Sequence, residues 1–473
     1  MNQLVVMKFG GTSMGSAERI RGAALLCEEQ YNRRPTCVVV SAMSKVTDLL
    51  LDTLRHAEGG DAAGLEANLQ TLEARHRETC LDLLEGPLAE ETLLVLSGIL
   101  NEFGRIARGV LMLGERPPRS VDEAIAVGER LSSTLMAAYL RSRNVDAFAV
   151  NARDVIVTDA VFGNAAPLLD PTREKAENLL KPELEAGRLP VITGFNGATL
   201  DGRPTTLGRG GSDFSASILA AVLDAEELWI WTDVDGIMSA DPRIVPEARV
   251  LEEITYREAA ELAYNGAKVL HPRTLAPLME REIPVWSKNS FKPEVPGTRI
   301  VPATADTASG ARAVTSMSNV ALVSLEPASA LLSGTKVMAR AIEALAETNA
   351  EVLALSSSSY RQNFCFLIRQ AELPAVIERL EQAFSLELAH GYLHPIDVDL
   401  DVGLLAIVGE GMKGQAGLAG RIFTAISREM VNIIAIAQGS SELTIAIVVR
   451  KDGIEKAVGA VHRECGLGPA AAV

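Results

Sequence analysis

Short apolar runs alternate with stretches of helical periodicity from the start of the chain to about residue 300. The runs at 4–7 and 36–40 are apolar without alternation, which is typical of parallel strands buried on both faces. Similar runs predict strands at 146–150, 191–195, 227–232 and 285–290. Helical spacing predicts helices from about residue 16, through 126–140, and near 172–186, 214–223 and 259–269. This order predicts an α/β domain with a mostly parallel sheet between helices.

Residues 52 to about 115 have helical periodicity, many charges and little strand signal. We expect a helical hairpin at the edge of the sheet, without catalytic side chains. Residues 293–297 and 304–310 have the composition of linkers. We therefore place a domain boundary near residue 305.

The chain after this boundary contains an internal repeat. Segments 339–345 and 352–355 recur 81 positions later, at 420–426 and 433–436. In the first copy we predict strands at 320–325, 352–357 and 364–368 and helices at 336–348 and 374–384. Copies of about 70–80 residues with the order strand, helix, strand, strand, helix predict two ferredoxin-like sandwiches.

Two glycine-rich motifs carry the candidate chemistry: KFGGTS at 8–13 and TTLGRGGSD at 205–213. Glycines let the backbone approach a phosphate, and the order strand, glycine loop, helix points amide N–H groups and the positive end of a helix at an anion. Lys8 adds a mobile positive charge beside the first loop. Ser212 and Asp213 can instead simply cap the following helix, but two such loops with charged partners favour a phosphoryl-transfer site.

Ser41 and Thr47 follow the predicted strand at 36–40. Ligands gather at the carboxyl ends of strands in open α/β sheets, so both hydroxyls are placed to face a small polar substrate. The structural alternative is an N-cap for a helix that starts near Thr47. For Glu129, in the first turn of a predicted helix, the alternative is a favourable interaction with the helix dipole. Residues 233–243 contain turn dipeptides, so a purely structural loop is the alternative there.

Neither glycine motif is a P-loop, and the signature motifs of protein kinases do not occur in the sequence. KFGGTS, TTLGRGGSD, WTDVDGIMSADPR at 231–243 and GAKVLHPRT at 266–274 resemble, in this order, the motifs of aspartate kinases, members of the amino-acid kinase superfamily. The resemblance covers essentially the whole chain. It implies an amino-acid kinase fold in residues 1–305, with an aspartate-binding lobe at about 1–200 and an ATP-binding lobe at about 201–305.

The resemblance also implies a role for each matching residue. Lys8 and Asp213 are the expected catalytic residues: Lys8 neutralises charge on the transferred phosphoryl group and Asp213 orients Lys8. The amides of the glycine loops are expected to hold the phosphoryl oxygens. The expected nucleotide-binding residues are Lys8, Gly10, Gly11, Ser212, Thr232, Asp233, Met238, Asp241, Arg243 and Lys268.

The expected substrate-binding residues are Ser41, Thr47, Glu129 and Arg209. Glu129 is expected to bind the substrate amino group, and the guanidinium of Arg209 suits the α-carboxylate because it can form two parallel hydrogen bonds. Two positions depart from the family pattern. Met238 stands where Tyr is common, and Val127 stands where many relatives have His.

The repeated part resembles the paired ACT domains of aspartate kinases. We expect the first ACT domain at 318–390, inserted into a second one formed by 311–317 and 391–466. Segments 409–412 and 437–442 are most similar to the regulatory part of bifunctional aspartate kinase–homoserine dehydrogenases, but no dehydrogenase part follows in this sequence, so a monofunctional enzyme is expected. The ACT pair is expected to hold a homodimer or a higher homo-oligomer.

The expected effector-binding residues are Glu351, Asn432 and Gln438. In the first copy, Glu351 and Ser357 stand at the positions of Asn432 and Gln438. Relatives that respond to lysine or threonine carry Gln or similar residues in the first copy as well, so we expect a weak or altered response to either amino acid alone. The alternative is that Glu351 binds the side-chain ammonium of lysine.

Composition and charge exclude several classes of function. A hydrophobic content of 48% excludes a mostly disordered chain, and a net charge of −16 argues against nucleic acid or an anionic membrane as the main partner. Five scattered cysteines without a CxxC pair predict neither disulfides nor a zinc site and fit a reducing cytoplasm. We expect no metal ligands in the protein, no membrane span and no signal or transit peptide.

The expected activity is the ATP-dependent phosphorylation of the L-aspartate side chain to 4-phospho-L-aspartate, with Mg²⁺ bound to ATP. This is the entry step to lysine, threonine, methionine and diaminopimelate. A carboxylate is already a nucleophile at neutral pH, so positioning and charge stabilisation are the main requirements. The alternatives are a kinase for another acid, such as glutamate or N-acetylglutamate, and a non-catalytic amino-acid sensor. The form of KFGGTS, the ACT pair and the presence of Lys8 and Asp213 favour aspartate kinase.

Overall fold

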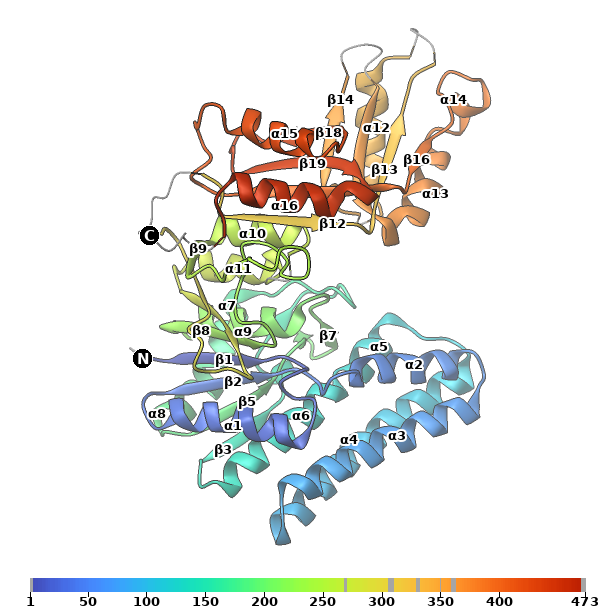
Figure 1. Ribbon diagram of the computed structural model, residues 1–473. Helices are drawn as coiled ribbons and strands as arrows, with labels where there is room; N and C mark the ends of the chain where they lie inside the picture. The colour runs from blue at the N-terminus through green and yellow to red at the C-terminus, as the bar shows by residue number, and fades with distance from the viewer. Residues whose placement is uncertain are drawn as a thin grey trace, which may run out of the picture. The chain divides into compact units, whose positions relative to one another are not determined.

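The computed structural model describes residues 3–267, 270–304, 310–328, 332–348, 350–358 and 363–468. The chain forms two compact units (Figure 1). The first comprises Met1–Ile237, Glu252–Tyr256 and Leu270–Thr304, and the second comprises Met238–Leu251, Arg257–Val269 and Ala305–Val473. No helix in the described part of the chain is both long enough and apolar enough to cross a bilayer.

An eight-stranded sheet forms the centre of the first unit, in the order β3-β5-β2-β1-β8-β10-β11-β9 (Figure 1). All neighbouring strands are parallel except β10 and β11. Every residue of β1, β2 and β5 is buried, which explains their uninterrupted apolar runs. The predicted α/β fold with a mostly parallel sheet is confirmed. The strands are β1 (Val5–Phe9), β2 (Thr36–Val40), β3 (Ala147–Val150), β5 (Leu189–Thr193), β8 (Glu227–Thr232), β9 (Glu253–Thr255), β10 (Val285–Asn289) and β11 (Thr298–Val301).

Helices pack on this sheet, and further helices form a helical region of the first unit. The predicted hairpin at 52–115 is present as α3 and α4; α4 has a Pro in its first turn and ends at Gly114, whose φ is 67°. A small sheet of β4 (Val157–Thr158), β6 (Asn196–Thr199) and β7 (Pro204–Thr206) precedes the second glycine motif. The helices are α1 (Ala17–Tyr31), α2 (Val46–Glu58), α3 (Ala62–Leu83), α4 (Gly86–Leu113), α5 (Pro118–Ile125), α6 (Val127–Ser142), α7 (Leu169–Leu179), α8 (Lys181–Glu185), α9 (Gly211–Val222) and α11 (Pro272–Met279).

Two four-stranded antiparallel sheets form the second unit, in the orders β12-β17-β19-β18 and β14-β15-β13-β16 (Figure 1). The strand before the first copy, β12, pairs with β17 of the second copy, and β16, which follows residue 390, pairs with β13 of the first. The strands are β12 (Ala313–Met317), β13 (Val320–Leu325), β14 (Ala354–Ser357), β15 (Phe364–Arg369), β16 (Asp397–Asp399), β17 (Val402–Val408), β18 (Ile433–Gln438) and β19 (Thr444–Arg450). The helices are α12 (Gly334–Ala346), α13 (Leu373–Ala383), α14 (Ser385–Ala389), α15 (Leu418–Arg428) and α16 (Ile454–Glu464).

The segment Met238–Leu251 packs into the core of the second ACT copy. Ala240 and Val245 belong to the same apolar cluster as β17, β19 and α16. The Ser239 hydroxyl lies 3.0 Å from Nε2 of His462, and the Ser239 carbonyl accepts a hydrogen bond from the amide of Val314 at 2.8 Å. Because these groups are buried, their hydrogen bonds compensate for the lost contacts with water.

Three helix starts or ends differ from the sequence-based predictions. Helix α9 begins at Gly211 after Gly210, whose φ is 71°, so Ser212 and Asp213 lie inside the helix and do not cap it. Helix α2 begins at Val46 after Lys45, so Thr47 is not its N-cap. The helix predicted at 259–269 is α10 (Tyr256–Tyr264), and it ends before Gly266, whose φ of 95° is incompatible with a continuing helix.

Candidate active site

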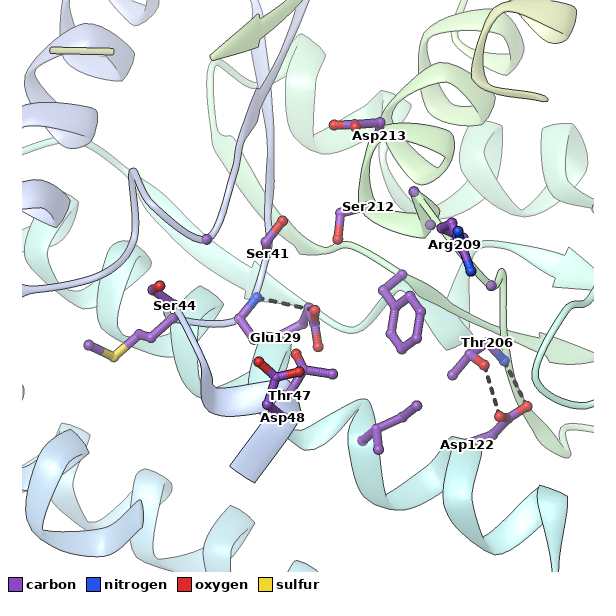
Figure 2. A pocket seen from close by; sticks show the side chains of 18 of the residues that line it. Ser41, Ser44, Thr47, Asp48, Asp122, Glu129, Thr206, Arg209, Ser212 and Asp213 are labelled. Carbon is purple, nitrogen blue, oxygen red and sulfur yellow. Dashed lines mark hydrogen bonds between the residues drawn. The ribbon is translucent and has the colours of Figure 1, made fainter. Parts of the chain in front are cut away.

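A cavity of about 600 Å³ lies at the carboxyl ends of β1, β2 and β5. Both glycine motifs, the loop after β2 and the first turn of α6 contribute to its wall. Figure 2 shows Ser41, Glu129 and Thr47 on one side of the cavity and Arg209 and Thr206 on the other. The position agrees with the rule that ligands bind beyond the carboxyl ends of parallel strands.

Lys8 and Asp213 form an ion pair across the two glycine motifs. Lys8 lies on β1 and is 8% exposed, and its Nζ is 2.6 Å from Oδ1 of Asp213 in the first turn of α9. β1 and α9 thus bring together two residues that are 205 positions apart in the sequence. Both line the cavity. A positive charge is therefore held beside two loops of small residues, as a phosphoryl-transfer site requires.

Two glycines of the loops, Gly11 and Gly211, lie close to their neighbours. A Cβ at Gly11 would lie 3.1 Å from the carbonyl oxygen of Ala42, and one at Gly211 would lie 2.6 Å from Cδ2 of Phe195. The amide of Gly10 donates to the carbonyl oxygen of Trp231 at 3.3 Å. Gly210 has a φ of 71°, which favours glycine, and it leads directly into α9. The first turn of α9 therefore faces the cavity with its positive end.

Glu129 is 3% exposed and lies in the first turn of α6. Its Oε1 accepts a hydrogen bond from the amide of Ala42 at 3.1 Å (Figure 2), whereas no partner for its Oε2 occurs among the described residues. Desolvation raises the pKa of this carboxyl to about 8, against smaller lowering effects of the Ala42 amide and the Lys8 charge. A cationic group that enters the cavity would stabilise the charged carboxylate.

Ser41, Thr47, Arg209 and Ser212 also line the cavity, so all four predicted substrate-binding residues, Glu129 included, line it together with Ser212. Ser41 directly follows β2, and Thr47 lies in the first turn of α2 (Figure 2). Arg209 is exposed within the second glycine motif. These residues thus combine hydroxyl groups with the guanidinium of Arg209 and the buried carboxyl of Glu129.

The sequence-based prediction missed Asp122. This residue of α5 is buried, and its carboxylate accepts hydrogen bonds from the amides of Gly163 at 2.8 Å and Thr206 at 2.9 Å and from the Thr206 hydroxyl at 2.8 Å (Figure 2). Desolvation raises the pKa of Asp122, although these three donors lower it. Asp122 therefore fixes the strand that leads into the second glycine motif. No motif surrounds it in the sequence.

Phe195 was predicted only as the end of a strand, but it lines the cavity. Its φ is 72°, a conformation that is unfavourable for a bulky residue, and its amide donates to the Ser215 hydroxyl at 2.9 Å. Such strain is typical of functional sites. Ser44, Lys45 and Asp48, at the turn into α2, line the cavity as well and were not predicted.

Two of the predicted nucleotide-binding residues, Thr232 and Asp233, lie at the carboxyl end of β8. The hydroxyl of Thr232 donates to the Asp233 carboxylate at 3.2 Å, and the Thr232 carbonyl accepts hydrogen bonds from the amide and the hydroxyl of Ser290. The Ser290 hydroxyl lies 2.8 Å from that of Ser13, in the first glycine motif. Hydrogen bonds thus connect the ends of β8 and β10 with the loop after β1.

Met238, Asp241 and Arg243 belong to the second unit. Met238 forms an antiparallel bridge with Val250. The guanidinium of Arg243 binds the Asp241 carboxylate, with Nε at 3.0 and 3.1 Å from the two oxygens. Lys268 lies outside the described residues.

The predicted effector residues lie in the second unit on exposed or partly exposed positions. Asn432 and Gln438 are exposed immediately before and at the end of β18. Glu351 accepts a hydrogen bond from Nη1 of Arg369 on β15. A ligand that uses Glu351 would therefore compete with Arg369.

Comparison with protein families and known proteins agrees with the motifs. The model of the amino acid kinase family matches residues 3–289, and a model of the ACT domain matches residues 405–465. The chain is 37% identical over 465 residues to bifunctional aspartokinase/homoserine dehydrogenase 1, chloroplastic, of Arabidopsis thaliana, with 97% of this chain and 50% of that protein covered. It is 31% identical to aspartokinase 1, chloroplastic, of the same plant, with 97% and 79% covered. The chain thus spans about half the length of the bifunctional relatives that it matches.

Solved structures show the same fold. The structure of Escherichia coli aspartokinase III in complex with aspartate and ADP (R-state) has a TM-score of 0.82 and 29% sequence identity, and 98% of this chain and 99% of that chain are covered. The complex of the same enzyme with lysine and aspartate (T-state) has a TM-score of 0.80 and 30% identity, with the same coverage. The chain therefore belongs to the amino acid kinase family, and its relatives within that family are aspartokinases.

Proposed function

We propose that the protein phosphorylates the side-chain carboxylate of L-aspartate with ATP and forms 4-phospho-L-aspartate and ADP. The observation that carries this proposal is the Lys8–Asp213 ion pair, which lies between two glycine loops in the cavity that also contains Glu129. A fixed cation at this place opposes the repulsion between a carboxylate and the γ-phosphate. The aspartokinase relatives support the choice of substrate.

Aspartate has three charged groups, and the cavity offers a partner for each. Oε2 of Glu129 suits the ammonium group, and the exposed guanidinium of Arg209 suits the α-carboxylate. The side-chain carboxylate then lies toward Lys8 and the amides of Gly10, Gly11, Gly210 and Gly211. The hydroxyls of Ser41, Thr47 and Ser212 supply further hydrogen bonds. In this arrangement Glu129 and Arg209 orient aspartate, and Lys8 stabilises the charge on the transferred phosphoryl group.

ATP is proposed to place its phosphates on the first glycine loop and its nucleoside near the end of β8. Thr232 and Asp233 would contact the nucleoside. Met238, Asp241 and Arg243 of the second unit remain predictions for nucleotide binding. The Asp241 carboxylate binds the guanidinium of Arg243, so we expect the two side chains to contact a ligand as a pair. Lys268 remains a prediction for the phosphates.

Mg²⁺ is proposed to enter with ATP, where it neutralises charge on the phosphates. Asp213, which lies at the glycine loops, is paired with Lys8. Among the residues that the structure describes, no three His, Cys, Asp or Glu side chains gather as a metal site. We propose that the phosphate oxygens would hold the metal, with few or no protein ligands.

The proposed setting is the entry step to lysine, threonine, methionine and diaminopimelate. The paired ACT sheets support feedback control by lysine or threonine and assembly into a homodimer or a higher homo-oligomer. We propose the cytoplasm as the compartment, because the cysteines are scattered and few. We propose a kinase part at 1–305 and two ACT domains beyond it; the pairing of β16 with β13 supports extending the first ACT sheet to residue 399. Light scattering on the full chain tests assembly, and a monomer at micromolar concentration would contradict it.

The decisive experiment measures ADP release with a panel of amino acids and traps acyl phosphate with hydroxylamine. Aspartate should give ADP and the hydroxamate in equal amounts. Hydroxamate from glutamate or N-acetylglutamate instead would support the kinase class but change the substrate. Amino-acid binding without ADP release for any acid would favour a non-catalytic sensor.

A further inference from the structure

The helical hairpin of α3 and α4 reaches the active site through Arg75. This residue lies on α3, is half-buried and does not line the cavity. Its Nη1 donates to the carbonyl oxygen of Ser44 at 2.8 Å, and its Nη2 donates to the carbonyl oxygen of Gly15 at 3.1 Å. One guanidinium thus binds two backbone segments that are 29 positions apart in the sequence.

The two segments that Arg75 connects both contribute residues to the wall of the cavity, among them Gly11 and Ser44. Gly15 closes the loop that begins with KFGGTS, and Ser44 belongs to the loop between β2 and α2. These loops are also bonded directly, since the amide of Ser44 donates to the carbonyl oxygen of Gly11 at 3.1 Å. Both polar backbone atoms of Ser44 are therefore held, one by the first glycine loop and one by Arg75.

The backbone beside this contact is strained. Lys45, which shares its peptide group with the Ser44 carbonyl, has a φ of 65°. Residues with a side chain seldom adopt this left-handed conformation. The bond from Arg75 fixes the orientation of that peptide group, and Thr47 follows two residues later. Replacement of Arg75 should therefore alter the backbone position of Thr47 and of Gly11.

We propose that Arg75 is a positioning residue that clamps the phosphate loop at 10–15 to the substrate loop at 41–47. The inference rests on the proposed function, in which the first loop holds the transferred phosphoryl group and the second holds aspartate. The clamp sets the separation of the two reactants without contacting either. A guanidinium is needed because its fork of N–H donors can bind two carbonyls at fixed angles, which a single ammonium does not do.

A simpler account is that Arg75 only supplies positive charge near the phosphates. The two accounts predict different activities for Arg75→Lys, because this variant keeps the positive charge but loses the rigid arrangement of N–H donors. Arg77→Ala is the matched control, because Arg77 lies on the same helix and is exposed. Arg75→Ala removes both charge and fork.

The test combines kinetics with hydrogen exchange of backbone amides in the free protein. In Arg75→Ala, exchange should accelerate in residues 10–16 and 41–47 and stay unchanged in the rest of α3. The same variant should lose on the order of 10–100-fold in kcat, because small misplacements of reactants cost this much. Arg75→Lys should recover only part of the loss, and Arg77→Ala should match the wild type in both measurements.

Three results would overturn the clamp: wild-type kcat in Arg75→Lys, unchanged loop exchange in Arg75→Ala, or faster exchange along all of α3, which would indicate a role in helix stability. Hydrogen exchange does not depend on the reaction. If the wild type fails to phosphorylate aspartate while the two loops loosen in Arg75→Ala, the clamp stands and the proposed function fails.

Discussion

Lys8 and Asp213 form the contact on which the proposed chemistry depends most. Their charges are 2.6 Å apart, and Lys8 is almost completely buried. If both act where charge develops in the transition state, Lys8→Ala and Asp213→Ala should each lower kcat by about 10²-fold or more and change the aspartate KM much less. ADP release at saturating aspartate and ATP measures this. Lys181→Ala, an exposed lysine at the start of α8, is the control, and near-normal kcat in either site variant would refute the assignment.

Glu129 makes the stability of the free protein depend on pH. Its pKa is about 8 in the folded protein and 4.5 as an ordinary value, so the folded state binds this proton more tightly than the unfolded state. The resulting stabilisation is complete below pH 4.5 and is lost as the pH rises through about 8. Glu129→Gln cannot lose a proton, so its melting temperature should rise relative to the wild type between about pH 5 and pH 9. Glu90→Gln, at an exposed position of α4, should show no such trend.

The same carboxyl links aspartate binding to proton release. An ammonium group beside Oε2 favours the charged form of Glu129, so binding near neutral pH should release a proton. Calorimetry in buffers of different ionisation enthalpy measures the number of protons released on binding. Glu129→Gln should release none and should raise the aspartate KM while leaving the ATP KM nearly unchanged. A fall in ATP affinity instead would place Glu129 in the nucleotide subsite.

At the level of elements, α6 approaches the loop after β2 closely enough to require glycine. A Cβ at Gly128 would lie 2.7 Å from Cβ of Ala42, whereas one at Gly98 on α4 would have no atom within 4 Å. Gly128→Ala should destabilise the fold by about 1–3 kcal/mol and raise the aspartate KM, since it displaces the loop that carries Ser41. Gly98→Ala should stabilise it by about 0.4–1 kcal/mol. Urea unfolding of both variants measures the difference, and equal effects would contradict this reading of the packing.

Elements with a strong local pattern could be predicted from the sequence. The strands β1 and β2 contain continuous apolar runs, and the hairpin of α3 and α4 is long and periodic. The strands β4, β7 and β16 have only two or three residues each, so no period of two can appear in them. Where the start of α9 was misjudged, the cause was Gly210, which caps the helix by its left-handed backbone in place of the expected side chain.

The residues that line the cavity could likewise be predicted only where a local sequence motif marks them. Lys8, Gly11 and Asp213 stand in motifs whose chemistry is local, and they line one cavity. Asp122 acts through Thr206, which is 84 positions away, and nothing beside it in the sequence indicates that contact. Phe195 lines the cavity and has a positive φ, which composition does not reveal in a non-glycine residue.

At the level of the whole molecule, the open question is how the ACT part responds to amino acids. Glu351 of the first copy is paired with Arg369, while its counterpart Asn432 and the end of β18 at Gln438 are exposed. An effector's ammonium group would have to displace Arg369 before it could use Glu351. The side chain of Gln438 is an uncharged amide, which can bind either the ammonium group or the carboxylate group of an amino acid.

We therefore expect weak or altered inhibition by lysine or threonine alone, with any inhibition that occurs depending on Gln438. Activity is titrated with both amino acids, singly and together, in the wild type, Glu351→Ala, Gln438→Ala and the control Glu343→Ala, an exposed residue of α12. Gln438→Ala should abolish the response and Glu343→Ala should leave it intact. Arg369→Ala distinguishes the rival account: if Glu351 is a lysine ligand, removing its competitor should strengthen lysine inhibition. Strong lysine inhibition that Glu351→Ala abolishes and Gln438→Ala leaves unchanged would refute the preferred assignment, because the first copy would then hold the effector.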